Sequence, residues 1–227
     1  MNYTFSGFTK ETFQFFRELE QNNTKEWFDQ NRKRYEVEVR ERFKELCISL
    51  EPAMKSIDVD FDLRPHRCIS RINRDTRFSK DKSPYKTHLW MSFMLPATSE
   101  EWIGLPGFFL EVSVESYVYG MGLYQPKRVI MDDFRDHMAY RASEFQEKTQ
   151  KIVLDRGFSI GGEEYKRPLK NELGEYFQQW YHRKGVYVSK TCVNGSEVFS
   201  SDFQKIIQDD FLALEWLYSF MKQSIPE

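Results

Sequence analysis

The sequence has few cysteines and no long apolar run. Its 227 residues include three cysteines, Cys47, Cys68 and Cys192, too few for the disulfide framework of a small secreted domain. We therefore expect reduced thiols and a cytoplasmic location. No apolar stretch reaches about 18 residues, and the opening segment lacks the basic and apolar regions of a signal peptide. We expect neither a membrane span nor a cleaved leader.

The sequence also lacks the spacing patterns of metal and dinucleotide sites. No CxxC, HExxH or EF-hand pattern occurs, and the four histidines stand apart, so we expect no metal site. Gly120 and Gly122 resemble the start of a dinucleotide fingerprint, but the third glycine is missing and both fall in a predicted strand. Close backbone packing or a bulge is the better interpretation. We expect no cofactor.

Glu111 and Glu115 do not have the spacing of a glycosidase pair, and a carboxylate partner on a neighbouring strand stays open. Glu111 and Glu115 share one face of a predicted strand, which separates their backbones by roughly 13 Å. Glycosidase carboxyl pairs stand about 5–9.5 Å apart. The sequence therefore assigns no catalytic residue and leaves open whether the protein is an enzyme.

What the sequence does contain indicates a folded protein. Apolar residues make up 40% and aromatic residues 16%, and the formal net charge is −2. Disordered chains have few aromatics and a strong excess of one charge. This composition predicts a buried core.

The apolar residues follow two periods. Thr9 is the expected N-cap of the first helix, with Phe8 and Phe13 as its hydrophobic staple, and Asn23 is the expected cap of a long second helix that ends before Pro52. Period-two alternation predicts an antiparallel sheet with one covered face. Helical spacing returns in the C-terminal part. We predict strands at 67–73, 88–94, 107–115, 116–124 and 186–190.

These elements predict an α+β fold, in which an antiparallel sheet packs against several helices and the N- and C-terminal segments are helical. The chain contains no low-complexity linker and no internal repeat. We therefore expect a single domain over residues 1–227. A helical C-terminal subdomain from about residue 126 is the alternative.

Positive charge is concentrated in residues 64–88. This segment carries eight Lys and Arg against two Asp, a formal charge of +6, whereas the rest of the chain carries −8. Segregation of this kind marks an interaction surface or a local salt-bridge network. Asp, Ser and Pro within it are typical of a defined loop between two strands.

We predict that this basic loop binds a phosphate- or carboxylate-bearing small molecule, because Arg and Lys side chains and free backbone N–H groups recognise such anions. The interpretation that stays open beside it is structural, with Asp75 and Asp81 pairing neighbouring cations. The predicted ligand-binding residues are Arg71, Arg74, Asp75, Arg77, Lys80, Lys82, Tyr85 and Lys86.

A second set of residues lies at helical spacing near the N-terminus. Trp27, Asn31 and Tyr35 share one side of a predicted helix and could form the wall of a pocket beside the basic loop. The favoured alternative is core packing of Trp27 and Tyr35, with Asn31 bonded to a loop.

Another function stays open for the same basic loop. It could dock an acidic partner without catalysis, or nucleic acid through Phe78 and Tyr85. The acidic remainder of the chain and the absence of a nucleic-acid-binding motif argue against nucleic acid. The sequence gives no indication of the oligomeric state.

Three motifs resemble one protein family. They are FSGFTKETFQFFRELEQNNTKEWFDQNRKRYE (5–36), RINRDTRFSKDKSPYKTH (71–88) and GMGLYQP (120–126). In this order and spacing the chain resembles DUF2461, a widespread bacterial family of unknown function. The resemblance implies a compact α+β protein of about this length. It implies no reaction, and so no catalytic residues to carry over.

Overall fold

The computed structural model of the chain describes residues 4–77, 80–98 and 104–225. The helices are α1 (Lys10–Gln21), α2 (Lys25–Tyr35), α3 (Glu41–Ile57), α4 (Pro65–Cys68), α5 (Arg128–Tyr140), α6 (Ala142–Gln150), α7 (Glu175–Tyr181), α8 (Asp202–Ala213) and α9 (Glu215–Lys222), with π-helical turns η1 (Glu36–Arg40) and η3 (Lys151–Asp155) and a 3-10 turn η4 (Ser196–Phe199). The strands are β1 (Leu89–Phe93), β2 (Gly107–Val112), β3 (Ser116–Leu123), β4 (Ser159–Gly161) and β5 (Val186–Val193).

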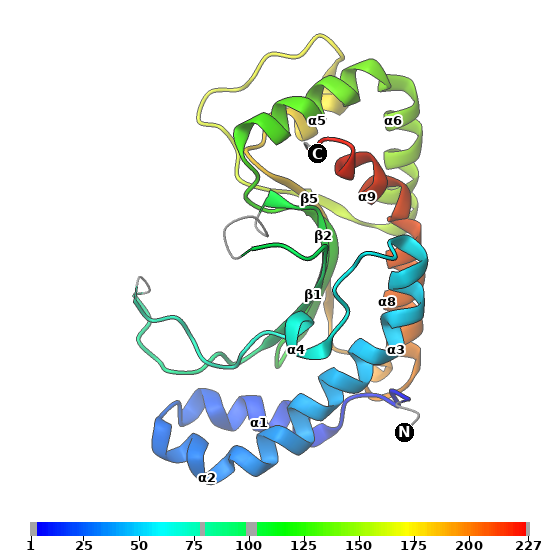
Figure 1. Cartoon of the computed structure of the whole chain (residues 1–227). Coiled ribbons are helices and arrows are strands. Elements are labelled where there is room, and N and C mark those ends of the chain that lie inside the picture. Colours follow the sequence, from blue (N-terminus) through cyan, green and yellow to red (C-terminus); the bar gives the residue numbers. More distant parts are fainter. Residues whose placement is uncertain (1–3, 78–79, 99–103, 226–227) are drawn as a thin grey trace.

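The strands form one antiparallel sheet in the order β1-β2-β3-β5-β4. Strands β1, β2 and β3 are consecutive in the chain and pair through short connections or loops, whereas β5 pairs with β3 after a long helical excursion. The α+β fold predicted from the two periods is confirmed. Figure 1 shows the sheet curved, with α3, α8 and α9 running along its convex side.

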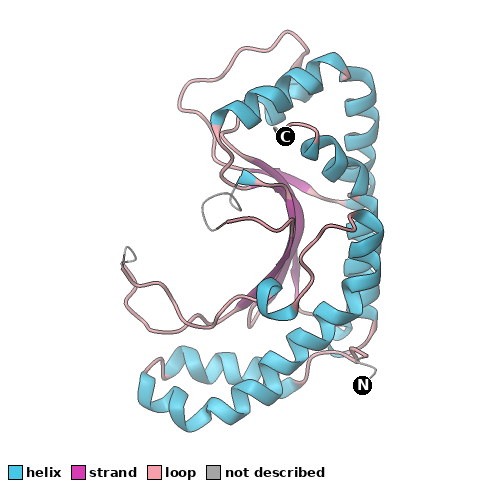
Figure 2. Ribbon diagram, in the orientation of Figure 1, coloured by secondary structure: helices cyan, strands magenta, loops and turns pink. Residues whose placement is uncertain are grey.

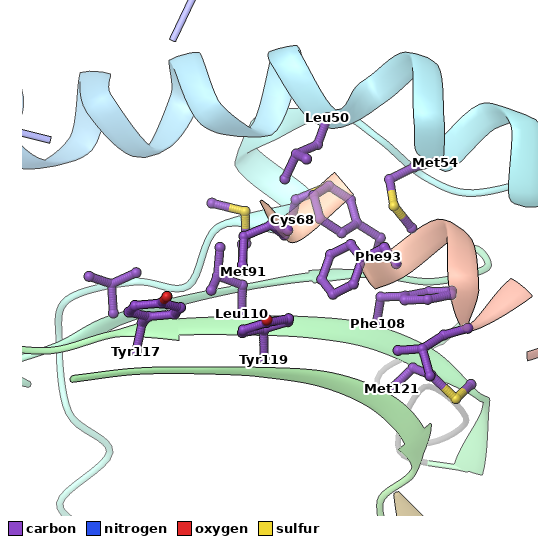
Figure 3. Close-up of a cluster of buried hydrophobic side chains, with 14 of the residues drawn as sticks. Leu50, Met54, Cys68, Met91, Phe93, Phe108, Leu110, Tyr117, Tyr119 and Met121 are labelled. Carbon is purple, nitrogen blue, oxygen red and sulfur yellow. The ribbon is translucent and has the colours of Figure 1, made fainter. Parts of the chain in front are cut away.

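The convex side is the covered face of the sheet, and it holds the core. Figure 3 shows side chains from β1, β2 and β3 pointing toward Leu50 and Met54 of α3. Phe108 is fully buried, and its ring centroid lies 5.0 Å from that of Phe211 in α8 and 5.5 Å from that of Tyr218 in α9. Burial of each such aromatic side chain stabilises the fold by about 1.5–3 kcal/mol.

The N-terminal helices begin where the sequence places them. Thr9 caps α1 by accepting from the backbone N–H of Thr12, and the rings of Phe8 and Phe13 meet at 6.0 Å. The cap of α2 is Thr24, one residue beyond the expected Asn23. The side chain of Asn23 is engaged instead with the basic loop, as described below.

Two local predictions were wrong. Residues 67–73 do not form a strand, because Pro65 starts the single turn of α4 and only isolated bridges follow at Ile69 and Asn73. Helix α3 continues through Pro52 to Ile57. Proline costs a helix interior about 3 kcal/mol, and complete burial of Met54 in the core offsets this cost.

The opposite side is the open face of the sheet, which is concave and turned away from α3, α8 and α9 (Figure 2). The loop of residues 71–77 and 80–87 extends from one end of this face (Figure 1). Helix α5 and the segment after β4 lie at the other end. No helix within the described residues has the length and apolar character needed to cross a bilayer.

Candidate functional site

The basic loop leaves the sheet as a short two-stranded ribbon, which we call the loop ribbon (residues 71–74 and 84–87). The N–H of Arg74 donates to the carbonyl of Pro84 at 2.9 Å, and that of Lys86 to the carbonyl of Ile72 at 2.8 Å. Alternation along paired strands sends successive side chains to opposite sides. Arg74 and Lys86 therefore share one side of the ribbon, and Arg71 and Tyr85 share the other.

The tip of the loop satisfies most of its charges within itself. Asp75 accepts two bonds from the guanidinium of Arg77, at 3.0 and 2.7 Å, and Arg77 holds the pKa of Asp75 at about 2. Lys82 Nζ donates to the carbonyl of Thr76 at 2.7 Å. Lys80 is exposed to solvent. The structure thus places these predicted residues in a solvent-exposed tip that its own hydrogen bonds hold in shape.

Helix α2 and the residues before it anchor the other side of the ribbon. Asn23 donates to the carbonyl of Tyr85 and accepts from its N–H, both at 3.0 Å. The ring of Tyr85 stacks on Phe28 of α2 with centroids 4.1 Å apart. Burial raises the pKa of Tyr85, so its hydroxyl is neutral. These contacts fix the base of the loop against the N-terminal helices.

A cavity of about 610 Å³ lies beside this contact, and we call it the junction pocket. One wall comes from α2, η1 and α3, and the other from residues 65–73 of the chain. Its aromatic residues are Phe28, Tyr35 and Tyr85, its basic residues Arg32, Arg40, Lys44 and Arg71 with His66, and its acidic residues Glu36 and Glu41.

The cations of the junction pocket differ in how they are paired. Arg40 lies 3.3 Å from Glu36, and Lys44 lies 3.2 Å from Glu41, across successive turns of the same helical segment. Arg71 is exposed and forms no ion pair with any carboxylate of the described chain. Its charge lowers the pKa of Asp75 at longer range, without the direct pairing that Arg40 and Lys44 have.

The π-helical turn η1 forms part of the wall. Its extra residue per turn lies between α2 and α3, and Glu36 and Arg40 of this turn both line the pocket. Such turns occur often at functional sites. Burial raises the pKa of Tyr35 to about 12, which keeps its hydroxyl protonated and able to donate.

The other side of the loop ribbon faces the open side of the sheet. Lys86 Nζ donates to the carbonyl of Arg71 at 2.9 Å and lies 5.9 Å from the ring centroid of Trp90. Burial lowers the pKa of Lys86, and the charges of Arg71 and Arg74 lower it further. The positive charges of Lys86, Arg71 and Arg74 therefore lie within interaction range of one another.

The predicted pocket wall is only partly brought to the site. Tyr35 lines the junction pocket. Trp27 packs on Phe15, with centroids 5.5 Å apart, and Asn31 donates to the carbonyl of Trp27 at 2.9 Å. Neither of these two lines the pocket. The packing of Trp27 agrees with the alternative, whereas Asn31 bonds within its own helix α2 and not to a loop.

Sequence reasoning missed most of the pocket lining. Helical spacing offered a signal for part of it, because Arg32, Glu36 and Arg40 recur every four residues and so share one side of a helix. Nothing local in the sequence linked them to a loop about 35 residues farther on. The missed residues with aromatic or ionisable side chains are Phe28, Arg32, Glu36, Arg40, Glu41, Lys44 and His66.

Two other features make weaker candidates. A cavity of about 720 Å³ lies between α1, the β2–β3 turn and the end of β5, but its two cations, Lys10 and Arg17, are outnumbered by Glu11, Glu18 and Glu115. Its lining therefore carries a net negative charge. Across residues 4–77, 80–98 and 104–225, no three His, Cys, Asp or Glu side chains are grouped as metal ligands.

Comparison with known families places the chain. The model of the family described as "Conserved hypothetical protein (DUF2461)" matches residues 11–220 of the 227. No curated protein is similar enough in sequence to count as a match. Two of the motifs that carry the resemblance, 5–36 and 71–88, meet in space at the junction pocket. The chain belongs to the DUF2461 family.

Proposed function

We propose that the protein binds a small molecule carrying a phosphate or carboxylate group in the junction pocket, with Arg71 as the main contact for the anion. The observation that carries this proposal is that Arg71 lines a concave cavity and has no carboxylate partner among the described residues. The proposal places binding in the cytoplasm, in keeping with three free cysteines. It assigns no reaction.

The chemistry of the lining supports an anionic ligand with an apolar part. A guanidinium offers two parallel N–H donors to a carboxylate or phosphate, and charge-assisted hydrogen bonds contribute about 1.5–3 kcal/mol each. Arg32, Arg40 and Lys44 add positive potential, although each has an acidic neighbour. Phe28 and Tyr85 supply an apolar surface.

The proposal is tested by calorimetric titration and thermal unfolding with inorganic phosphate, citrate, sugar phosphates and nucleotides. A ligand at a hundred times its dissociation constant adds about 2.7 kcal/mol of stability. We expect at least one compound to bind, and Arg71→Gln to weaken it by about 10- to 100-fold, the loss of one charge-assisted contact.

The matched control is Lys80→Gln, which removes a charge from the exposed tip of the same loop and leaves the affinity unchanged. The proposal fails if none of these compounds binds, or if Arg71→Gln binds as tightly as the wild type. A response limited to oligonucleotides, with a steep salt dependence, would instead support docking of an acidic macromolecule.

A further inference from the structure

The open face of the sheet carries a row of ring-bearing side chains. In the register of β1 and β2, Trp90 lies opposite Glu111, and Ser92 lies opposite Phe109. All four are half-buried, whereas their neighbours along the strands are buried on the covered face. The aromatic rings therefore border solvent on the side that the helical layer leaves open.

Glycines in β3 allow rings from non-adjacent strands to meet. Phe109 pairs with Gly120, and Gly122 pairs with Tyr187 of β5. A Cβ at Gly120 would lie 1.9 Å from the carbonyl oxygen of Val188, so only glycine fits. The rings of Phe109 and Tyr187 meet edge to face over the glycines of β3, with centroids 6.1 Å apart.

Positive charge lies at the end of this row. Lys86 is beside Trp90, and Arg74 shares its side of the loop ribbon. Lys86 forms no ion pair with a carboxylate of the described residues, whereas Arg74 lies 3.3 Å from Asp81. The Nε atom of Arg74 is buried without a hydrogen-bond partner. The ammonium of Lys86 thus stands next to the indole ring, and the guanidinium of Arg74 lies on the same side of the loop ribbon, where it also donates to the carbonyl of Tyr85 at 3.5 Å.

His88, which lies between Lys86 and Trp90 in the chain, adds a neutral polar group to this face. His88 Nε2 lies 3.7 Å from a carboxylate oxygen of Glu111. Burial lowers the pKa of His88, and Lys86 and Arg74 also lower it, against the opposing charge of Glu111. The imidazole is therefore neutral at neutral pH. The carboxylate of Glu111 is half-buried on the same face and is a group that accepts hydrogen bonds from an amino group.

We propose that the open face beside the loop ribbon is a second binding site, which takes a nucleoside monophosphate with its base stacked on Trp90 and its phosphate held by Lys86 and Arg74. Aromatic side chains on an open sheet are stacking platforms for bases. Charge complementarity selects a phosphate at the cationic end. This site is separate from the junction pocket, since Lys86 and Arg71 face opposite sides of the ribbon.

The test titrates the full-length protein with AMP, adenosine and ribose 5-phosphate, using calorimetry and tryptophan fluorescence. We expect AMP to bind at least about tenfold more tightly than either fragment, and to quench fluorescence. Trp90→Leu weakens AMP at least about tenfold and removes the quenching, whereas Trp90→Phe retains a stacking ring and most of the affinity. Lys86→Gln weakens AMP by a similar factor.

Arg71→Gln distinguishes the two sites, because it removes the anion contact of the junction pocket and acts on AMP at the open face only through the charge that Arg71 exerts on Lys86. Loss of AMP binding in Arg71→Gln but not in Trp90→Leu would put the nucleotide in the junction pocket and overturn this inference while supporting the first proposal. Equal affinity for AMP and ribose 5-phosphate, or no AMP binding at millimolar concentration, would also overturn it. Affinity that rises with oligonucleotide length would replace the mononucleotide with a single strand.

Discussion

The two faces of the sheet differ in how their charged side chains are paired. On the covered face, the carboxylate of Asp210 accepts from Tyr119 at 2.6 Å, from Lys190 at 2.7 Å and from Arg156 at 2.8 Å. On the open face, Lys86 stands beside Trp90, and the charges of Arg71 and Arg74 act on it more strongly than the opposing charge of Glu111. Asp210 is buried and fully bonded, while Lys86 is half-buried and lacks a carboxylate partner in the described part of the chain.

The directions in which the pKa values of Asp210 and Lys86 are shifted show the same contrast. Burial alone would raise the pKa of Asp210, but hydrogen bonds from Lys190, Tyr119 and Arg156 outweigh it and lower the pKa. Burial lowers the pKa of Lys86, and neighbouring like charges lower it further. The fold favours the charged form of Asp210 and disfavours the charged form of Lys86. Charge that costs stability is typical of a binding site.

The largest expected effect is on the covered face. Asp210→Ala leaves Lys190 and Arg156 without their shared carboxylate, and we expect the free energy of unfolding to fall by about 3 kcal/mol. Chemical denaturation at neutral pH measures it. The matched control is Asp209→Ala, an exposed neighbour in α8, with an expected change within about 0.5 kcal/mol. Equal losses in the two variants would contradict the contrast between the faces.

A second buried carboxylate predicts a pH dependence. Burial would raise the pKa of Asp58, but bonds from Lys222 at 2.5 Å and Tyr218 at 2.6 Å lower it below the unfolded value. Its stabilisation is therefore complete above about pH 4. It is lost as the pH falls through the folded pKa, by at most about 1.4 kcal/mol for each pH unit.

Urea unfolding between pH 7 and pH 2.5 tests this dependence. We expect the wild type to lose stability toward acid more steeply than Asp58→Asn, which has no carboxylate to protonate at this site. The slope is the readout, because the substitution also changes stability at neutral pH. Equal slopes of unfolding free energy against pH in the two proteins would show that Asp58 is not among the groups that set stability in acid.

Much of the sheet could be predicted from the sequence because its signal is local. Period-two alternation predicted an antiparallel sheet with one covered face, and in β2 the buried Phe108, Leu110 and Val112 alternate with half-buried residues. The turn η1 could not be foreseen, since a π-helical turn leaves the apolar stripe of a long helix nearly unchanged. The partners of Asp210 were also out of reach, because Tyr119 lies 91 residues away.

The candidate site also has contacts that the sequence could predict and contacts that it could not. Asp75 and Arg77 are two residues apart, so their pairing belongs to the structural interpretation that the sequence had left open. The junction pocket joins Arg71 to Arg40 and Lys44, which depends on how the loop ribbon docks on α2. That docking rests on Asn23, whose side chain the sequence assigned to a helix cap.

The smallest expected effect is on the open face, at Lys86. Because burial and like charges disfavour its charged form, Lys86→Met removes that cost while keeping the packing of the alkyl chain, and we expect stability within about 1 kcal/mol of the wild type. The wild type should gain on the variant as the pH rises through the lowered pKa of Lys86, since deprotonation removes the same cost. Lys80→Met, at the exposed tip, is the matched control, and we expect its stability to stay within about 0.5 kcal/mol of the wild type. A loss above about 2 kcal/mol would mean that the bond from Lys86 to the carbonyl of Arg71 holds the ribbon together, and the open face would then resemble the covered one.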